Sequence, residues 1–252
     1  MRIFGINAVI EALRARRVTG IRVSQRIHAE DKARLAQVVR LAEEQHVDVR
    51  RVNADELDRL AGGPHRHQGV VADLPDNTQV SVEDLVVGAH AAPLLVVLDG
   101  IEDPHNVGAI LRTVDAAGAD GVVRQSRHAA RLDGAAAKVS AGAVAHVKIA
   151  EVVNIARALE SLKNAGVWTV GLSGDSPKRY DEIDLTVPTA IVVGAEGTGL
   201  RRLVRERCDW LASIPMLGHV QSLNVSVAAG IALFEAVRQR RAAADWAVRR
   251  GV

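Results

Sequence analysis

Residues 94–112 read LLVVLDGIEDPHNVGAILR, and this stretch predicts the fold of the larger part of the chain. Its first five residues, Leu94–Leu98, are all apolar, as expected of a β-strand that is buried on both faces of a sheet. A turn with Asp103 and Pro104 follows, and residues 107–117 have the apolar spacing of a helix. A buried strand that leads into a helix is the repeating unit of a parallel α/β sheet.

The same strand-and-helix pattern recurs toward the C-terminus. We expect further strands at 121–123, 147–150, 167–171, 190–193 and 211–214, and helices at 135–141, 154–165 and 224–241. The predicted fold class is therefore α/β, with a parallel sheet covered by helices on both faces. This domain is expected to span residues 93–252.

The N-terminal part predicts a smaller, separate α/β domain over residues 1–73. Asn7 is a plausible N-cap for a helix that runs to about Arg16. The other expected elements are strands at 21–24, 49–52 and 69–72 and a helix at 31–45. Residues 74–92 have poor periodicity and predict a linker with one short helical turn at 82–86.

Composition excludes several classes of protein. Of the 252 residues, 48% are hydrophobic and 25% charged, which is ordinary for a globular protein, and only 2% are aromatic. Few aromatic residues argue against a protein that stacks successive bases of a single strand. The single cysteine, Cys208, excludes an internal disulfide and a cysteine-rich zinc site and is expected to be a small buried apolar group. We expect no metal.

Charge and hydropathy set the expected compartment. The net charge is +2 with a pI near 9.0, a weak basic signal. The first fifteen residues lack the apolar core of a signal peptide, and no stretch of about 18 apolar residues could span a membrane. The expected location is the cytoplasm.

Three segments that follow predicted strands carry candidate chemistry. In the first, Asn106 could cap the helix and Arg112 lies six residues further along. The second, Gly194–Leu200, reads GAEGTGL, and its glycines would expose backbone N–H groups to a ligand. It matches neither the phosphate-binding Walker pattern nor the dinucleotide fingerprint. A capped turn or a tight connection would also explain each of these two segments.

The third segment runs from Ile214 to Ala228 and reads IPMLGHVQSLNVSVA. Ser222 or Asn224 can cap the long helix that follows, which is expected to bury Val225, Ala228, Ile231 and Ala232. Capping alone would account for this segment as well. The three segments become informative only when they are considered together.

In order along the chain, the N-x-G-x-x-x-R spacing, the VVGAEGTGL turn and the IPMLGHVQSLNVSVA run resemble the signature motifs of the SpoU/TrmH methyltransferases. The resemblance covers about residues 93–241. Residues 3–13 and 67–72 resemble the longer bacterial members, which carry an N-terminal RNA-binding domain of the ribosomal L30e type. His219 and Gln221 vary in the family and lie outside the core motif positions.

The resemblance implies a deep trefoil knot and binding of S-adenosylmethionine between the second and third segments. Gly194, Ile214 and Leu223 are expected to hold the adenine through backbone groups, and the remaining cofactor positions are Leu172, Gly174 and Gly199. The implied reaction methylates the ribose 2'-hydroxyl of a guanosine in the peptidyl-transferase region of 23S rRNA.

By the same resemblance, the catalytic residues are Arg112, Asn106, Glu196, Ser222 and Asn224. A guanidinium is effectively always charged, so we expect Arg112 to stabilise the developing alkoxide rather than accept its proton. Asn106 would orient Arg112 or the ribose, and the other three would shape the pocket. Family members place the site at a homodimer interface, and the stripe Val227, Ile231 and Phe234 would suit such packing or simple core burial.

RNA contact is expected from Arg201 and Arg202 beside the glycine turn, and from Arg14 and Arg66 in the N-terminal domain, although a solvated surface would also explain them. Three alternatives stay open. The first is the same chemistry on a tRNA or another rRNA nucleotide, and the second is a non-catalytic RNA-binding protein on this fold. The third, a nucleotide-binding dehydrogenase, is disfavoured by the failed glycine fingerprint.

Overall fold

The computed structural model describes residues 1–26, 29–63, 67–75, 80–89, 91–127, 129, 130, 132 and 134–250, without the side chains of 246–250. The chain forms two compact units. The first comprises residues 1–78, 107–112 and 130–146, and the second comprises 79–106, 113–129 and 147–252. The first unit therefore includes two short stretches that come from the middle of the chain.

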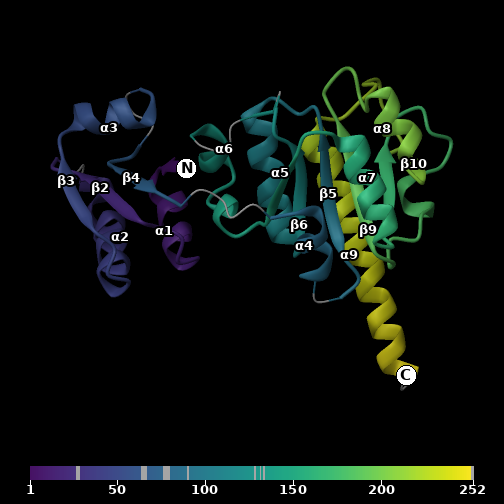
Figure 1. The fold of residues 1–252 in the computed structure, drawn as a ribbon, viewed down its shortest axis with the longest axis horizontal. Coiled ribbons are helices and arrows are strands. Elements are labelled where there is room, and N and C mark those ends of the chain that lie inside the picture. The colour runs from purple at the N-terminus through teal and green to yellow at the C-terminus, as the bar shows by residue number, and fades with distance from the viewer. Residues whose placement is uncertain are drawn as a thin grey trace. The chain divides into compact units, whose positions relative to one another are not determined.

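The first unit contains a four-stranded sheet in the order β1-β4-β2-β3. Its strand β4 is antiparallel to both neighbours, whereas β2 and β3 are parallel. In Figure 1, α3 lies on one side of this sheet, and α1 and α2 lie on the other. The described elements are β1 (Arg2–Phe4), α1 (Ile6–Arg14), β2 (Gly20–Ser24), a 3-10 turn (Ala29–Asp31), α2 (Lys32–Glu44), β3 (Val49–Val52), α3 (Ala54–Ala61), β4 (Val70–Asp73), α6 (Ala135–Val139) and a second 3-10 turn (Ala143–Ala145).

Two elements of this unit were not predicted. Strand β1 is only three residues long, too short to show an alternating pattern. Helix α3 is capped by Asn53, whose side chain accepts a hydrogen bond from the backbone N–H of Glu56 at 2.9 Å. It packs Leu57 against Phe4 and Val71 in a small apolar cluster. Asn53 followed three residues later by Glu56 is a helix-start pattern that could have been recognised.

The prediction that Asn7 caps the first helix is wrong. Helix α1 begins at Ile6, directly after Gly5, which has a φ of 95°. The backbone N–H of Ile6 donates instead to the side chain of Gln68 at 3.2 Å. The first backbone N–H of the helix is therefore satisfied by a residue 62 positions away, and no local pattern reveals such a contact.

The second unit contains a six-stranded sheet in the order β10-β8-β9-β5-β6-β7, and every neighbouring pair is parallel. This confirms the predicted parallel α/β architecture. The strands are β5 (Leu94–Asp99), β6 (Gly121–Gln125), β7 (Ile149–Val152), β8 (Trp168–Leu172), β9 (Thr189–Gly194) and β10 (Trp210–Ala212). The predicted strand at 147–150 begins two residues later, and the one at 211–214 ends two residues earlier.

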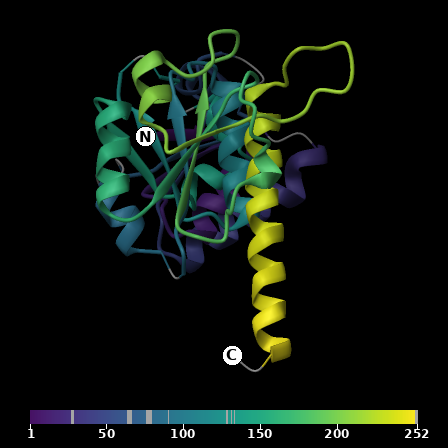
Figure 2. The same cartoon turned by 90° about the vertical axis from the view of Figure 1, so that its right-hand side faces the viewer.

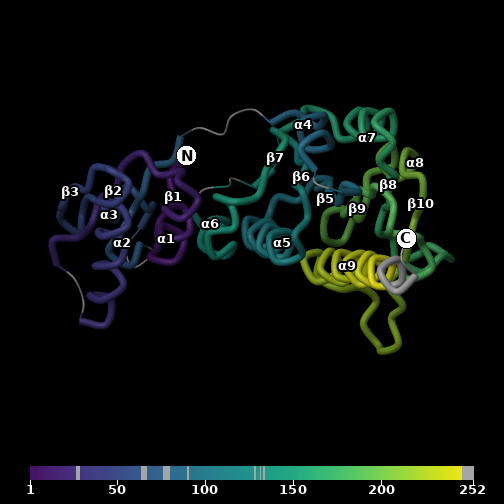
Figure 3. Tube along the Cα trace, turned by 90° about the horizontal axis from the view of Figure 1, so that it is seen from below, coloured from purple at the N-terminus to yellow at the C-terminus, as the bar shows by residue number. Residues whose placement is uncertain are grey.

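Helices cover both faces of this sheet. In Figure 3, α4 and α7 lie on one side of the strands and α9 lies on the other. Side chains from α4 and α7 pack against β5, β6 and β9 in one continuous core. The helices are α4 (Val82–Val87), α5 (Pro104–Ala117), α7 (Ile155–Asn164), α8 (Arg202–Arg207) and α9 (Val225–Arg250), with a 3-10 turn at Tyr180–Glu182. No described helix has both the length and the apolar character that crossing a membrane requires.

The cap of α5 also differs from the prediction. Asp103 is the N-cap, and its carboxylate accepts from the backbone N–H of His105 at 2.9 Å. Pro104 occupies the first turn, where its missing N–H costs nothing. Asn106 is therefore not a cap, and its side chain is available for another contact.

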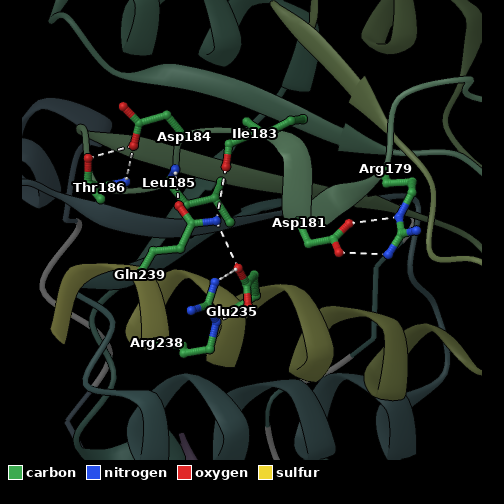
Figure 4. A network of polar contacts seen from close by, with 9 residues as sticks. All are labelled: Arg179, Asp181, Ile183, Asp184, Leu185, Thr186, Glu235, Arg238 and Gln239. Carbon is green, nitrogen blue, oxygen red and sulfur yellow. Dashed lines mark hydrogen bonds and ion pairs between the residues drawn. The ribbon is translucent and has the colours of Figure 1, made fainter. Parts of the chain in front are cut away.

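The long helix α9 is anchored by polar contacts to the loop that precedes β9 (Figure 4). The Gln239 side chain donates to the carbonyl of Ile183 at 3.1 Å and accepts from the N–H of Leu185 at 2.8 Å. The Arg240 guanidinium donates to the carbonyls of Leu185 and Val187 at 3.0 and 2.9 Å. Beyond these anchors the helix continues past the sheet (Figure 2).

Candidate active site

The carboxyl ends of the parallel strands place the three predicted segments at one edge of the sheet. Strands β5 and β9 are neighbours, and Asp99 is paired in register with Gly194. Strands β10 and β8 end together, with Ala212 opposite Leu172. Ligands bind open α/β sheets outside the carboxyl ends of the strands, so the site is expected at this edge.

The loops after β8, β9 and β10 line a pocket of about 700 Å³, here called the large pocket. All six positions that were predicted to hold S-adenosylmethionine line it, as do three of the predicted catalytic positions. They are Leu172, Gly174, Gly194, Gly199, Ile214 and Leu223, and Glu196, Ser222 and Asn224. Glycines and aliphatic residues make up most of this lining, and none of the described residues in it is aromatic.

The glycine turn requires its glycines. A Cβ atom on Gly194 would lie 2.2 Å from backbone atoms of Gly199, a distance that no side chain tolerates. Gly197 and Gly199 have φ values of 79° and 66°, a region in which side chains cause strain. The N–H of Gly199 donates to the carbonyl of Ala195 at 2.9 Å and closes the turn. The backbone thus folds back on itself beside the pocket.

Asn224 joins the three segments. Its Nδ2 donates to Asn106 Oδ1 at 2.9 Å and to Glu196 Oε1 at 2.6 Å. Its Oδ1 accepts from the backbone N–H of Ser226 at 2.9 Å and from the Ser226 hydroxyl at 2.5 Å. All four hydrogen-bonding positions of the amide are therefore used. We call Asn106, Glu196 and Asn224 the amide bridge.

Of the two predicted caps of α9, Asn224 is the one that makes the capping contact. Asn224 precedes the first residue of the helix, Val225, and caps it through the contact to Ser226. Ser222 lies in the wall of the large pocket. Asn106 is 7% exposed, and its Oδ1 accepts the hydrogen bond from Asn224.

A buried ion pair fixes the start of α8. Asp99 is fully buried, and its two oxygens accept from the backbone N–H of Arg201 at 2.8 Å and from the Arg201 Nε at 2.6 Å. The guanidinium of Arg201 remains about half exposed. Sequence reasoning did not name Asp99, although an acidic residue that ends an apolar strand is a usable signal.

A second pocket of about 490 Å³ lies beside the first and is here called the acidic pocket. Its lining includes four acidic residues, Asp99, Glu102, Asp103 and Glu196, and one arginine, Arg201. Five residues line both pockets, namely Ala195, Glu196, Thr198, Gly199 and Val225. Among the described residues, no group of three or more His, Cys, Asp or Glu side chains is arranged to hold a metal.

Asp175 lines the large pocket and was not predicted from the sequence. A hydrogen bond from Arg205 at 2.9 Å and a second from the Ser173 hydroxyl at 2.6 Å lower the pKa of this carboxyl to about 2. Arg205 also donates to the Ser173 hydroxyl at 3.0 Å. Asp175 therefore keeps a negative charge at the pocket rim at every physiological pH.

The predicted cations have different surroundings. Arg112 is exposed on α5, and the lining of the two pockets does not include it. Arg202 is exposed and pairs with Glu206 one turn along its helix at 2.8 Å. Arg14 is exposed and contacts Glu11 at 2.5 Å. Arg66 lies outside the described residues.

Comparison with known proteins shows two family matches that together span most of the chain. Residues 93–234 match the model of the SpoU rRNA Methylase family. Residues 2–79 match the model described as RNA 2'-O ribose methyltransferase substrate binding.

Individual relatives match over most of their length. A 23S rRNA (guanosine-2'-O-)-methyltransferase RlmB from Pseudomonas syringae is 43% identical over 96% of this chain and 96% of its own. The same enzyme from a Burkholderia species is 48% identical over 84% of this chain and 86% of its own. The crystal structure of the SpoU methyltransferase AviRb from Streptomyces viridochromogenes in complex with the cofactor AdoMet is 26% identical. It covers 96% of this chain and 91% of its own, with a TM-score of 0.77.

Proposed function

The chain belongs to the SpoU rRNA methylase family, and we propose that it transfers a methyl group from S-adenosylmethionine to the ribose 2'-hydroxyl of a guanosine in 23S rRNA, in the peptidyl-transferase region. The observation that carries this proposal is the amide bridge, which joins all three signature segments beside a pocket large enough for a nucleoside ligand. The names of the RlmB relatives support the substrate.

The large pocket fits S-adenosylmethionine chemically. Leu172, Ile214 and Leu223 offer apolar surface to an adenine ring, and the glycine turn allows close approach of backbone groups. Glu196 and Asp175 place negative charge in the lining, which suits a sulfonium cation. When bound, this cofactor supplies an electrophilic methyl group. The residues of the chain have to hold it, orient the acceptor and stabilise the charge that develops on the acceptor oxygen.

We assign that stabilising role to Arg112. Its side chain is exposed on α5, which leaves the guanidinium accessible to an RNA nucleotide. A guanidinium does not accept a proton at neutral pH, so it acts by electrostatic attraction to the alkoxide. Replacing it with Ala is expected to lower the methyl-transfer rate about 10²–10³-fold, as for other oxyanion-stabilising donors. If the Arg112→Lys variant kept near-full turnover and unchanged RNA affinity, that result would contradict this role for Arg112.

The amide bridge is proposed to position the acceptor. Asn106 and Glu196 both accept hydrogen bonds from the same amide, which restrains each side chain at the edge of the pocket. Ser222 lies in the same lining and offers a hydroxyl to the ribose or the cofactor. A site that holds its groups rigidly gains rate by keeping the reacting atoms aligned.

We further propose a homodimer and a trefoil knot. Val227 and Phe234 on α9 are 49% and 50% exposed, which leaves an apolar stripe on that helix outside the core. The neighbouring loop exposes Leu217 and Val220 even more. Exposed apolar surface of this kind is typical of a protein interface. The knot would pack the glycine turn against the loop after β10, which agrees with the shared lining of the large pocket.

The N-terminal unit is proposed to bind the RNA. We assign residues 1–73 to an L30e-like RNA-binding domain, 74–92 to a linker and 93–252 to the catalytic domain. The proposed phosphate contacts are Arg14 and Arg66 in the N-terminal domain and Arg201 and Arg202 beside the glycine turn, and each substitution would reduce the salt dependence of RNA binding by about one charge. Arg201 also serves the ion pair with Asp99, so Arg202 is the cleaner test. With ribosomal RNA as substrate, we place the enzyme in the cytoplasm.

Methylation assays with purified 23S rRNA fragments and bulk tRNA test the proposal directly. We expect labelled methyl transfer to the 23S fragment and none to tRNA, with one 2'-O-methylguanosine lost from the rRNA of cells that lack the protein. Transfer to tRNA alone would favour the tRNA alternative. Calorimetry that detects no S-adenosylmethionine binding would favour a non-catalytic RNA-binding protein.

A further inference from the structure

The acidic pocket contains a polar side chain whose acceptor is unused. Gln125, the last residue of β6, lines this pocket and is 9% exposed. Its Oε1 is shielded from solvent and accepts no hydrogen bond from any residue in the described part of the chain. A buried unsatisfied acceptor destabilises a fold, and such groups are rare in proteins unless they serve a function.

The charge of the acidic pocket indicates what it can bind. Four acidic residues and one arginine line it, and the arginine, Arg201, is already paired with the buried carboxylate of Asp99, so the other three acidic residues leave an excess of negative charge. Negative charge repels phosphate and attracts hydrogen-bond donors. The pocket therefore suits the hydroxyls of a ribose and the N–H groups of a base, while the phosphates of the same nucleotide stay outside.

The position of the acidic pocket relates it to the reaction. It shares Glu196 and the glycine turn with the large pocket, and Asn106 of the amide bridge lines it. A nucleoside in the acidic pocket would thus have its ribose beside the cofactor in the large pocket. This relationship rests on the proposed function.

We propose that the acidic pocket holds the acceptor guanosine and that Gln125 determines base specificity by accepting a hydrogen bond from the Watson–Crick edge of guanine. That edge carries two neighbouring donors, N1–H and the N2 amino group, whereas adenine presents an unprotonated N1 that would face acceptors. The terminal torsion of a glutamine is broad, so the Gln125 amide can turn into the pocket at little cost. A site built to pair a substrate N–H rejects an analogue that lacks it.

The test compares guanosine and adenosine at the mapped acceptor position of a 23S rRNA fragment, using the full chain. In Gln125→Leu, the methylation rate on guanosine should fall about tenfold, as for one lost hydrogen bond, with little change on adenosine. Gln125→Glu keeps an acceptor and should keep the preference for guanosine. Gln125→Leu should also melt at the same or a higher temperature, because it removes an unsatisfied buried acceptor.

Thr169→Val is the matched control. Like Gln125, Thr169 is buried on a strand of the six-stranded sheet, but its hydroxyl donates a hydrogen bond to the Asp209 carboxylate at 2.7 Å. This variant should lose stability and keep the guanosine preference. Equal losses on both acceptors in Gln125→Leu, or no loss at all, would overturn the assignment. Calorimetry of the unmodified chain with S-adenosylmethionine distinguishes a wrong role for Gln125 from a wrong proposed function. A chain that is no methyltransferase would not bind the cofactor at all.

Discussion

Asn224 Nδ2 lies 2.9 Å from Asn106 Oδ1, although 118 residues separate the two in the sequence. The same Nδ2 holds Glu196, and the Asn224 Oδ1 caps α9. One side chain therefore performs two tasks that can be separated, because the cap uses only its acceptor and the bridge uses only its donors.

Asn224→Asp separates these tasks. The new carboxylate can still cap α9, but it cannot donate to Asn106, and it would repel Glu196. We expect methyl transfer to fall at least tenfold. Because the cap remains, Asn224→Asp should lose less stability than Asn224→Ala, by about the 1 kcal/mol that a lost helix cap costs. Asn224→Ala should lose both the helix cap and the contacts to Asn106 and Glu196. Thermal unfolding and single-turnover methylation measure the two effects, and an active Asn224→Asp enzyme would contradict a positioning role for the bridge.

Two glycines of the large pocket should respond differently to the same substitution. In Gly194→Ala, the new methyl group would meet the Gly199 backbone at 2.2 Å, so we expect a loss of about 1–3 kcal/mol and weak cofactor binding. Around Gly174, a Cβ atom would meet nothing within 4 Å. Gly174→Ala should therefore unfold at the same urea concentration as the unmodified chain. Similar stability losses in both variants would argue against a packed glycine turn.

Two neighbouring arginines at the start of α8, Arg201 and Arg202, should also differ in their effect on stability. Arg201→Ala leaves the fully buried Asp99 carboxylate without its cation, which is expected to cost about 3 kcal/mol. Arg202 forms an exposed pair with Glu206, so Arg202→Ala should cost at most about 0.5 kcal/mol. Urea unfolding measures both. Adding Asp99→Asn to Arg201→Ala should recover part of the loss, and failure to do so would show that the buried charge is not its cause.

The thiol of Cys208 should react slowly. Burial raises its pKa from 9.0 to about 12, so the native thiol stays protonated through the range in which an ordinary cysteine ionises. At pH 9 we expect iodoacetamide to modify the native chain much more slowly than the urea-unfolded chain. Because the unfolded thiol ionises first, this group stabilises the fold fully below pH 9 and progressively less as the pH rises toward 12. Equal alkylation rates would contradict the burial.

Periodicity predicted most of the second unit because its elements are long or strongly apolar. Leu94–Leu98 identified a strand that is buried along its whole length. The helix predicted at 154–165 agrees with α7, whose start is capped locally by the Asn154 side chain. Patterns of this kind act over a few residues and can be seen without the fold.

Local reasoning failed where a distant residue satisfies the backbone or where an element is very short. The Gln68 side chain accepts the hydrogen bond from the first residue of α1, and Asp103 rather than Asn106 caps α5. Asn106 looked like a cap because a cap and a site residue use the same short amide side chain. Nothing in the sequence distinguishes the two uses.

The sequence alone determined the order of the motifs, the glycine-rich turn at 194–200 and the parallel α/β class, because these depend on local chemistry and on the spacing of apolar residues. Only the tertiary structure decided that Asn224 bridges Asn106 and Glu196, that Asp99 is paired with Arg201, and that the acceptor of Gln125 has no partner among the described residues. These relationships arise where strands from distant parts of the chain end at one edge of a sheet. Strand order sets which side chains meet there, and a linear pattern carries no information about it.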